Sequence, residues 1–216
     1  MAIDIQRYSG KEMEPQIETL GEFRLRYFRE FPYLYVGTKE NEQGHLAEYL
    51  ANPTARLFVA RDREKTVGIG IGTLLSTEKD ILQQTMESFR QNGLNPSDFF
   101  YFGEMIFMPE YRSRGIGKLM LNMLKKAGNE QKATRFCFLA VDRADDDPRK
   151  PQEHLDSAAI FQKFGFIKTS IQVVFEWPTI QLDGSVESTT NTLSPMSKSI
   201  YTSHSRRFVA SFSRAC

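Results

Sequence analysis

The sequence predicts an α/β protein built around a mixed sheet with flanking helices, and three observations lead to this prediction. Residues 101–127 read as a strand, a turn and an amphipathic helix. Residues 135–141 form a continuous apolar run, which is typical of a strand buried on both faces. A strand, a helix and a strand of these lengths imply a parallel pair with a right-handed crossover. Residues 56–75 instead read as an antiparallel hairpin, so the sheet should be mixed.

Length and composition indicate an ordinary globular protein. The chain has 216 residues, of which 40% are hydrophobic and 25% charged, and its net charge is +1. This length favours one domain, placed at residues 1–200, and residues 201–216 are expected to be a tail for which disorder is one reading. The small net charge gives no reason to expect nucleic acid or a membrane as a partner. The two cysteines favour a reducing cytoplasm.

The first part of the chain is expected to hold a strand at residues 3–8, a helix at 11–31 and a short helix at 45–50. Aromatic residues crowd around Pro32 between the two helices. They are either the end of a helix packed on the core or an aromatic wall of a substrate pocket, since pockets are mostly apolar. The residues assigned to such a wall are Phe28, Phe31, Tyr33 and Tyr35.

The hairpin that follows has strands at 56–61 and 66–75. Its second strand carries Gly68, Gly70 and Gly72 on one face, which is therefore nearly bare. A helix or a ligand could approach that face closely, and a helix is the preferred reading. The remaining elements are expected as a helical segment at 77–92, a helix at 155–164 that ends at Gly165, a strand at 166–177 ended by Trp177-Pro178, and a strand within 187–200.

The turn at residues 112–117 is the most informative feature. It follows a strand at 101–108, which Pro109 stops because proline cannot donate to a sheet. It precedes a helix whose apolar residues recur at helical spacing from 116 to 127, with Gly128 as the expected stop. The first N–H groups of a helix lack internal partners and, with the helix dipole, attract anions.

The residues of this turn suit a pyrophosphate. Gly115 and Gly117 allow the backbone to approach a ligand. Arg112, Arg114 and Lys118 add positive charge. The alternative reading is an ordinary strand, turn and helix whose glycines permit close packing.

Known phosphate motifs separate these readings. The Walker loop fails because position 112 is Arg and position 119 is Leu, and the dinucleotide fingerprint fails because Met120 stands where its third glycine belongs. What remains is Arg-x-x-Gly-x-Gly preceded by Pro109-Glu110-Tyr111. This pattern resembles the acetyl-CoA signature of the GNAT superfamily of N-acetyltransferases, with Phe107 in place of the usual valine. A second stretch, FQKFGF at residues 161–166, is similar to the closing motif Y-E-K-L-G-F of that superfamily.

The resemblance covers roughly residues 2–200 and implies a sheet of about seven strands, in which strands 101–108 and 135–141 splay apart. It also implies acetyl-CoA as cosubstrate, with the pantetheine arm in the gap and the pyrophosphate on the turn. The backbone N–H of Phe107 would then polarise the thioester carbonyl. The residues implied to contact the cosubstrate are Ile106, Phe107, Met108, Arg112, Ser113, Arg114, Gly115, Ile116, Gly117, Lys118 and Phe161.

The sequence departs from the superfamily at Phe161. The family commonly has Tyr there, and its hydroxyl often protonates the leaving thiolate, which Phe cannot do. The frequent Asn seven residues earlier is His154 here, a candidate proton shuttle for which a structural role is the alternative. A thiol of pKa about 8.5 can leave as thiolate, so the loss of the acid need not abolish turnover.

Acetyl transfer to an amine also needs a base. A lysine-like ammonium of pKa about 10.4 is almost entirely protonated at pH 7. The best candidate is Glu104, a carboxylate within an apolar strand, to which we assign a catalytic and acceptor-binding role. The alternative is a salt bridge to a neighbouring arginine. No spacing of His and Cys suits a metal site, so no metal is expected.

Three functions are compatible with these features. The leading one is acetyl-CoA-dependent N-acetylation of a small-molecule amine. The second is N-acetylation of a peptide or protein, which an open groove between residues 28–35 and the last strands would favour. The third is a non-catalytic acyl-CoA-binding module, which the absence of the tyrosine would favour. The oligomeric state is left open, a homodimer included.

Overall fold

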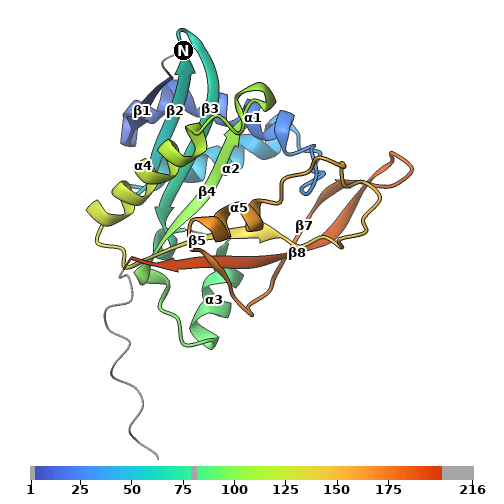
Figure 1. Cartoon of the computed structure of the whole chain (residues 1–216). Coiled ribbons are helices and arrows are strands. Elements are labelled where there is room, and N and C mark those ends of the chain that lie inside the picture. The colour runs from blue at the N-terminus through green and yellow to red at the C-terminus, as the bar shows by residue number, and fades with distance from the viewer. Residues whose placement is uncertain (1–2, 79–81, 201–216) are drawn as a thin grey trace, which may run out of the picture.

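The computed structural model describes residues 3–78 and 82–200, so the expected tail lies outside the described residues. Within these ranges the chain forms one mixed sheet of eight strands, where the resemblance implied about seven. The strand order is β1-β2-β3-β4-β5-β8-β6, and β7 also pairs with β8 (Figure 1). The pairings are antiparallel except for β4 with β5, which are parallel as the sequence predicted.

The elements have the following bounds. The strands are β1 (Asp4–Tyr8), β2 (Arg56–Asp62), β3 (Lys65–Leu74), β4 (Phe99–Phe107), β5 (Arg135–Val141), β6 (Ile167–Lys168), β7 (Val173–Ile180) and β8 (Val186–Ser199). The α-helices are α1 (Glu14–Tyr27), α2 (Lys39–Ala51), α3 (Gln83–Gln91), α4 (Ile116–Glu130) and α5 (Ser157–Lys163).

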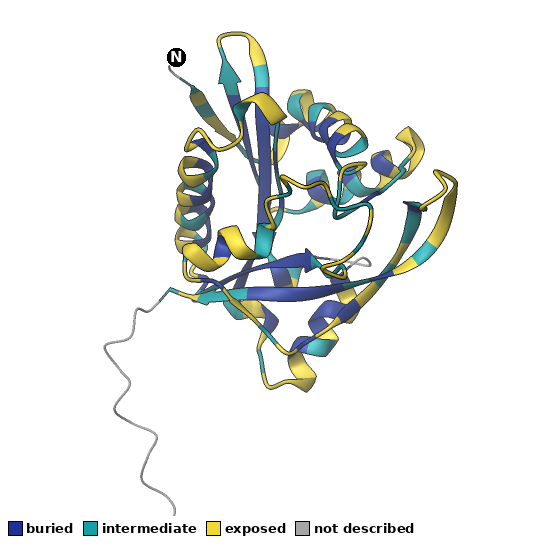
Figure 2. Ribbon diagram, turned by 45° about the vertical axis from the view of Figure 1, so that its right-hand side comes forward, coloured by how far each residue is buried: buried dark blue, intermediate teal, exposed yellow. Residues whose placement is uncertain are grey.

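Helices cover both faces of the sheet. The helices α1 and α2 pack over β2, β3 and β4 around buried residues such as Leu20 and Ile69. On the opposite face α4 packs against the same strands through Met120 and Leu124, which are fully buried. The central strands are accordingly buried along most of their length, and α4 buries only one side (Figure 2). The chain therefore holds β4 between two helical layers.

The bare face of β3 is covered by a helix, as the sequence favoured. A Cβ atom at Gly70 would lie 2.6 Å from Met120 Sδ of α4. Glycine at this position therefore lets α4 approach the sheet closely.

Two expected stops are wrong. Gly128 lies inside α4, which continues to Glu130. It faces the rings of Phe100 and Phe136, and a Cβ there would lie 2.8 Å from each, so packing rather than helix termination requires the glycine. Pro178 lies inside β7 opposite Ser188. Proline is tolerated there because the backbone of residue 178 faces away from β8, where its carbonyl accepts from the N–H of Val36 at 2.9 Å, so the missing N–H costs no hydrogen bond to β8.

Other bounds also differ from those expected. The short helix expected at 45–50 is α2, which already begins at Lys39 after the Thr38 cap. The first helix, expected to reach residue 31, ends at Tyr27, and the chain then turns before Pro32. The residue before a proline avoids helical geometry, which is consistent with this early end. The strand expected at 166–177 is split into β6 and β7. Between them the N–H of Ile171 bonds the Thr169 hydroxyl instead of a neighbouring strand.

Candidate active site

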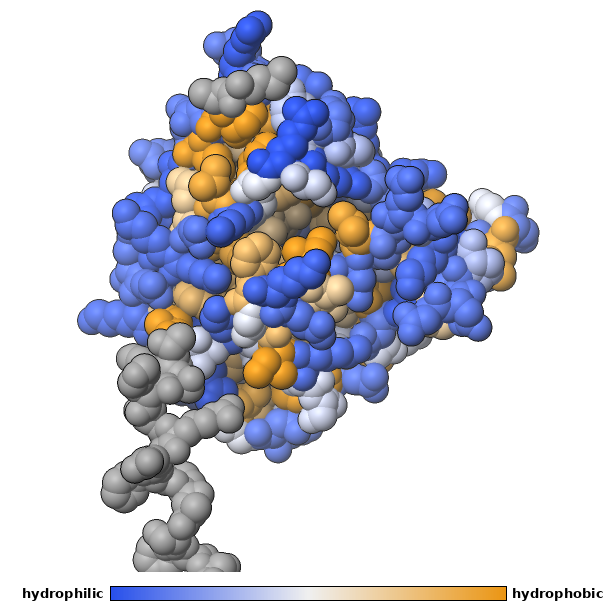
Figure 3. All heavy atoms as spheres, in the orientation of Figure 1, coloured by the Kyte–Doolittle hydropathy of each residue, from blue (hydrophilic) through white to orange (hydrophobic). Residues whose placement is uncertain are grey.

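The strands β4 and β5 diverge, as the resemblance implied. They pair only at their first three positions, from Phe99 opposite Arg135 to Tyr101 opposite Cys137. Beyond Tyr101 the two strands run in different directions (Figure 1). In the same orientation, apolar side chains gather in the middle of the face (Figure 3). The divergence leaves one edge of β4 free of a partner strand.

The free edge of β4 presents the backbone of Phe107. The N–H of Met108 donates to Val67 O at 2.9 Å, so it is not available to a ligand at this edge. Backbone groups alternate between the two sides of a strand, so those of Ile106 also point to β3 and those of Phe107 point away from it. The carbonyl of Phe107 accepts from Arg112 Nε at 3.0 Å. Of the three residues predicted to pair with pantetheine, Phe107 therefore has the suitable orientation.

A bulge in β4 directs Glu104 to the face of α1 and α2. Phe102 pairs with Gly72 and Glu104 with Ile71, so Gly103 is an extra residue in the strand. An extra residue reverses the alternation of side chains. Phe102 accordingly belongs to the core under α4, whereas Glu104 lies with Tyr49 of α2 on the other face.

Glu104 is buried and bound by three side chains. Arg24 Nη1 donates to its Oε1 in an ion pair. His45 Nε2 lies 3.2 Å from the same oxygen, and the Tyr49 hydroxyl donates to Oε2 at 2.9 Å. Only 4% of the Glu104 side chain is exposed. The salt-bridge alternative raised by the sequence is thus present in the structure, and the carboxylate reaches other molecules only through its partners.

A second carboxylate shares Arg24. Arg24 Nε donates to Glu42 Oε2 at 2.5 Å, and the Tyr35 hydroxyl donates to Glu42 Oε1 at 2.9 Å. Two carboxylates thus face one guanidinium, which leaves one excess negative charge when both are ionised and His45 is neutral. Buried charge of this kind is costly unless a further cation compensates it.

The pKa values of this cluster follow from burial and charge. Burial alone would raise the pKa of Glu104, but the charge of Arg24 and the bonds from His45 and Tyr49 lower it below its usual value. Burial alone would lower the pKa of Arg24, and the charges of Glu104 and Glu42 raise it instead. Burial and the charge of Glu104 raise the pKa of Tyr33 to about 12. Glu104 and Arg24 are therefore both charged at neutral pH.

The pKa of another buried carboxylate, Glu78, is shifted in the opposite direction from that of Glu104. It accepts bonds from Thr73 Oγ1 at 2.5 Å and from Asn52 Nδ2 at 3.2 Å. Burial raises its pKa, and the charge of Glu104 adds to the effect. Paired acids whose environments separate their pKa values are typical of functional sites.

Two of the residues predicted to form an aromatic wall lie beside this cluster. The rings of Phe28 and Tyr33 stack at 4.3 Å, and the Arg24 guanidinium lies 5.0 Å from the Phe28 centroid. Phe31 packs edge-on against His154 at 4.8 Å. Burial lowers the pKa of His154, so it is neutral at pH 7. All four aromatic residues are half-buried, and Tyr35 contacts Glu42 through its hydroxyl rather than another ring of the set.

Backbone contacts join the aromatic segment, defined as residues 28–36, to β7. Tyr35 forms a bridge with Thr179. The N–H of Val36 donates to Pro178 O at 2.9 Å, and Ile180 N–H donates to Leu34 O at 2.9 Å. Segment and strand are therefore closed against each other, with no open groove between them along these residues.

The turn before α4 has two glycines whose surroundings leave room for a Cβ, and N–H groups that point at no acceptor in the described part of the chain. Gly115 has a φ of +83°, which favours glycine, and a Cβ there would meet nothing within 4 Å. A Cβ at Gly117 would meet only the Phe107 ring, at an ordinary 3.6 Å. Packing within the described chain therefore does not require either glycine. Among the described residues, no acceptor is found for the N–H groups of residues 113–117.

The basic residues of the turn are placed differently from one another. Arg112 Nη1 donates to Glu30 Oε2 at 2.7 Å, and its Nε donates to the Phe107 carbonyl. Arg112 therefore connects the turn to the end of β4 and to Glu30. The guanidinium of Arg114 lies 5.3 Å from the ring centroid of Tyr111, and Lys118 is exposed on the first turn of α4. Arg114 and Lys118 are exposed beside the free N–H groups.

Phe161 lies in an aromatic cluster on α5. Its ring centroid is 4.2 Å from that of Phe138 of β5 and 5.2 Å from that of Phe166. The side chain forms part of the core under α4. No hydroxyl is available at this position to protonate a thiolate, as the sequence indicated.

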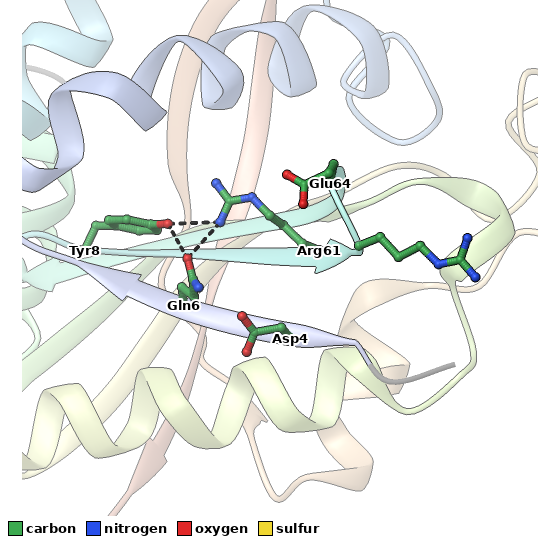
Figure 4. Close-up of a pocket in the computed structure, with 6 residues that line it drawn as sticks. Asp4, Gln6, Tyr8, Arg61 and Glu64 are labelled. Atoms are coloured by element: carbon green, nitrogen blue, oxygen red, sulfur yellow. Dashed lines mark hydrogen bonds between the residues drawn. The ribbon is translucent and has the colours of Figure 1, made fainter.

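A polar hollow at the edge of the sheet lies away from this region. It is lined by residues of β1 and β2, with Arg61 at its centre (Figure 4). Arg61 already donates to Gln6 Oε1 at 3.0 Å and to the Tyr8 hydroxyl at 2.9 Å. A third bond, to Gln16 Oε1 at 2.6 Å, also engages the Arg61 guanidinium, and β1 is the outermost strand. We therefore place the active site at the opening between β4 and β5.

Sequence reasoning missed four members of the cluster around Glu104. They are Arg24, Glu42, His45 and Tyr49. The last three share one side of α2 at spacings of three and four residues, a signal that was available but weak. Their importance follows from the bulge at Gly103, and no local pattern marks that bulge.

In the part of the chain that the structure describes, no cluster of three or more His, Cys, Asp or Glu residues is arranged to hold a metal ion. The same residues include no helix long and apolar enough to cross a membrane.

A splayed parallel pair with a free strand edge, next to an open helix N-terminus, is an arrangement that suits an extended ligand with an anionic end. The sequence matches the model of the acetyltransferase (GNAT) family over residues 20–166. This match spans more than half of the chain, which therefore belongs to the GNAT family and is an acyltransferase. No curated protein matches the sequence significantly.

Solved structures support the fold. The PaiA N-acetyltransferase of Thermoplasma acidophilum, in complex with coenzyme A, is 14% identical with a TM-score of 0.52, over 92% of this chain and 99% of that one. A polyamine N-acetyltransferase of Drosophila melanogaster is 12% identical with a TM-score of 0.55, over 92% and 100%. A mosquito arylalkylamine N-acetyltransferase-like protein is 14% identical with a TM-score of 0.56, over 91% and 100%. At these identities the likeness concerns the fold alone.

Proposed function

We propose that the protein transfers an acetyl group from acetyl-CoA to a primary amine of a small molecule, by direct attack of the amine on the thioester. The observation that carries this proposal is the position of the buried acidic cluster. Glu104 lies on β4 three residues before Phe107, whose backbone faces the opening between the strands. A carbonyl bound at Phe107 and an amine drawn to the cluster would meet at this opening.

The residues present fit acetyl-CoA. The N–H groups of residues 113–117, with Arg114 and Lys118 beside them, would hold the pyrophosphate. The free edge at Phe107 would pair with the pantetheine arm and polarise the thioester carbonyl. Bound there, the cosubstrate supplies an activated acetyl group, and a relative of the same fold is solved with coenzyme A.

The acidic cluster favours a cationic acceptor. Glu104 and Glu42 together exceed the charge of Arg24, so an ammonium group would compensate the remaining charge. The rings of Phe28 and Tyr33 add an apolar surface that also attracts cations. These features support roles for Glu104 in catalysis and acceptor binding, and His154 stays a candidate beside the aromatic wall.

The closed contact between the aromatic segment and β7 supports a small acceptor rather than a peptide. A peptide would need a groove between these elements, and the bridge of Tyr35 to Thr179 closes it. Two neighbours of the same fold bear the names polyamine and arylalkylamine N-acetyltransferase. We therefore include both kinds of amine among the candidate acceptors.

Thiol release tests the proposal. The purified protein is mixed with acetyl-CoA and, in turn, with a polyamine, an arylalkylamine, an aminoglycoside, an amino acid and a peptide bearing a free N-terminus. We expect amine-dependent release with at least one of the small amines and a larger kcat/KM than with the peptide. Binding of acetyl-CoA without release for every amine would instead support an acyl-CoA-binding module.

A further inference from the structure

We propose that His45 accepts the proton of the acceptor ammonium through its Nδ1 atom, and that Glu104 acts behind it as a positioning residue. This inference rests on the proposed function and refines the role of Glu104 within it. The carboxylate of Glu104 has three side-chain partners, Arg24, His45 and Tyr49.

Only one of these partners can pass a proton onward. The guanidinium of Arg24 has no acceptor atom. Tyr49 donates its hydroxyl proton to Glu104 and holds it firmly in a buried site. His45 has two ring nitrogens, and only Nε2 faces the carboxylate. A proton that Glu104 influences therefore moves through His45.

The carboxylate fixes the tautomer of His45. An ionised carboxylate accepts hydrogen bonds and cannot donate them, so Nε2 at 3.2 Å must carry the ring proton. In the neutral imidazole, Nδ1 then carries a free lone pair. The ring also packs edge-on against Tyr49, at 4.8 Å between centroids, which limits its rotation.

Nδ1 is the atom that lacks a partner. It is one of only two buried side-chain nitrogen or oxygen atoms among the described residues without a hydrogen bond, and the other is Thr85 Oγ1. Buried polar atoms are nearly always paired, so an unpaired one is a candidate for a bond to a bound ligand. A carboxylate, an oriented imidazole and a free lone pair form the arrangement that general-base histidines use.

The proton transfer is balanced as follows. When an acceptor reaches Nδ1, which is buried in this structure, the ammonium N–H gives its proton to that atom, and His45 becomes an imidazolium held by Glu104. The freed lone pair of the amine attacks the thioester carbonyl, and the C–S bond breaks. The second amine proton leaves with formation of the amide and neutralises the thiolate, and His45 returns its proton to solvent.

Three titratable groups lie against His45 or are coupled to it by charge. Glu104 of β4 contacts Nε2, Tyr49 of α2 packs against the ring, and Glu78 after β3 is coupled to it by charge. Arg24 of α1 lies one contact further away, bound to Glu104.

The first test is the tautomer, which needs no acceptor. The chain contains three histidines, so ¹⁵N-edited NMR of the labelled full-length protein gives few signals, and H45Q assigns that of His45. We expect the wild-type ring to carry its proton on Nε2 at neutral pH, and E104Q to lose this preference. A proton on Nδ1 in the wild type would overturn the proposal.

The second test is the pH–rate profile of H45Q with whichever amine reacts best. Glutamine can still donate to Glu104 but has no basic nitrogen. We expect kcat to fall about 100-fold at pH 7, to recover steeply as the free amine fraction rises with pH, and acetyl-CoA affinity to hold within about twofold. Q43A, on the exposed side of α2, is the matched control.

The outcomes separate the two proposals. A wild-type pH profile in H45Q overturns the role of His45 and leaves acetyl transfer intact. If no amine releases thiol with the wild-type protein, the proposed function fails, and His45 is then judged by the tautomer measurement alone.

Discussion

Arg24 on α1 and Glu104 on β4 form a buried ion pair although eighty residues separate them in the chain. Arg24 also binds Glu42, so one guanidinium holds two carboxylates and fastens α1 and α2 to the central strand. The geometry of the proposed acceptor site therefore depends on a contact between the outer helical layer and the sheet.

Replacing Arg24 should strongly destabilise the fold. The variant R24M leaves Glu104 and Glu42 buried without a counter-charge, for which we expect a loss of about 3–5 kcal/mol in the free energy of unfolding. Urea denaturation at pH 7 measures it. The matched control is R26M on the exposed side of α1, which should change stability by about 0.5 kcal/mol or less. A loss below about 1 kcal/mol in R24M would contradict the importance of this pair.

The variant E78Q should become more stable than the wild type as pH rises, because the wild type loses stability there. Burial raises the pKa of Glu78 in the folded state above its unfolded value. The wild type therefore loses stability as pH rises through the unfolded and then the folded pKa, while glutamine stays neutral and can accept the bond from Thr73. We expect E78Q to be more stable than the wild type at pH 8 and equal to it below the unfolded pKa.

Urea denaturation of E78Q and of the wild type at several pH values measures this difference in stability. The same measurement on E104Q should give a difference of the opposite sign and serves as the comparison. The folded pKa of Glu104 is lowered, so its ionised form contributes stability above the unfolded pKa that is lost as pH falls through the folded pKa. E104Q should therefore be less stable than the wild type at pH 7, with a deficit that shrinks in acid. Parallel curves for E78Q, E104Q and the wild type would contradict both assignments.

Local patterns in the sequence were sufficient to predict β4, the turn, α4 and β5, because each carries its own periodicity and breakers. The position of Glu104 could not be predicted in this way, since the bulge at Gly103 is set by packing. A Cβ at Gly103 would collide with the hydroxyl of Tyr49, a residue more than fifty positions away. The prediction that Gly128 ends its helix was wrong for the same reason, because the rings that require this glycine belong to β4 and β5.

Substitutions at the two glycines of the turn should separate ligand binding from folding. In G117V the new Cβ meets only the Phe107 ring, so we expect stability within about 1 kcal/mol of wild type and acetyl-CoA affinity at least about tenfold weaker. G115A instead forces a positive φ on alanine and should cost about 1 kcal/mol. Calorimetric titration and thermal melts measure the two effects. Unchanged affinity in G117V would remove the turn from the cosubstrate site.

The last prediction concerns Arg143, which follows β5 and holds the aromatic segment by hydrogen bonds to its backbone. Its guanidinium donates to Pro32 O at 2.8 Å, to Tyr33 O at 3.2 Å and to Asn191 Oδ1 at 2.7 Å. In R143M the segment loses these bonds, so the rings of Phe28 and Tyr33 are less well positioned for an acceptor.

We expect R143M to raise the KM for the amine about tenfold while acetyl-CoA affinity stays unchanged, because the hydrogen bonds of Arg143 go to the aromatic segment and Asn191 and none goes to the turn before α4. The bond from Trp177 Nε1 to Tyr33 O, at 3.1 Å, remains and should keep the variant folded. R90M, an exposed arginine of α3, is the control and should behave as the wild type. If R143M lowered acetyl-CoA affinity as much as it raised the amine KM, the aromatic segment would belong to the cosubstrate site. The acceptor would then have to enter elsewhere.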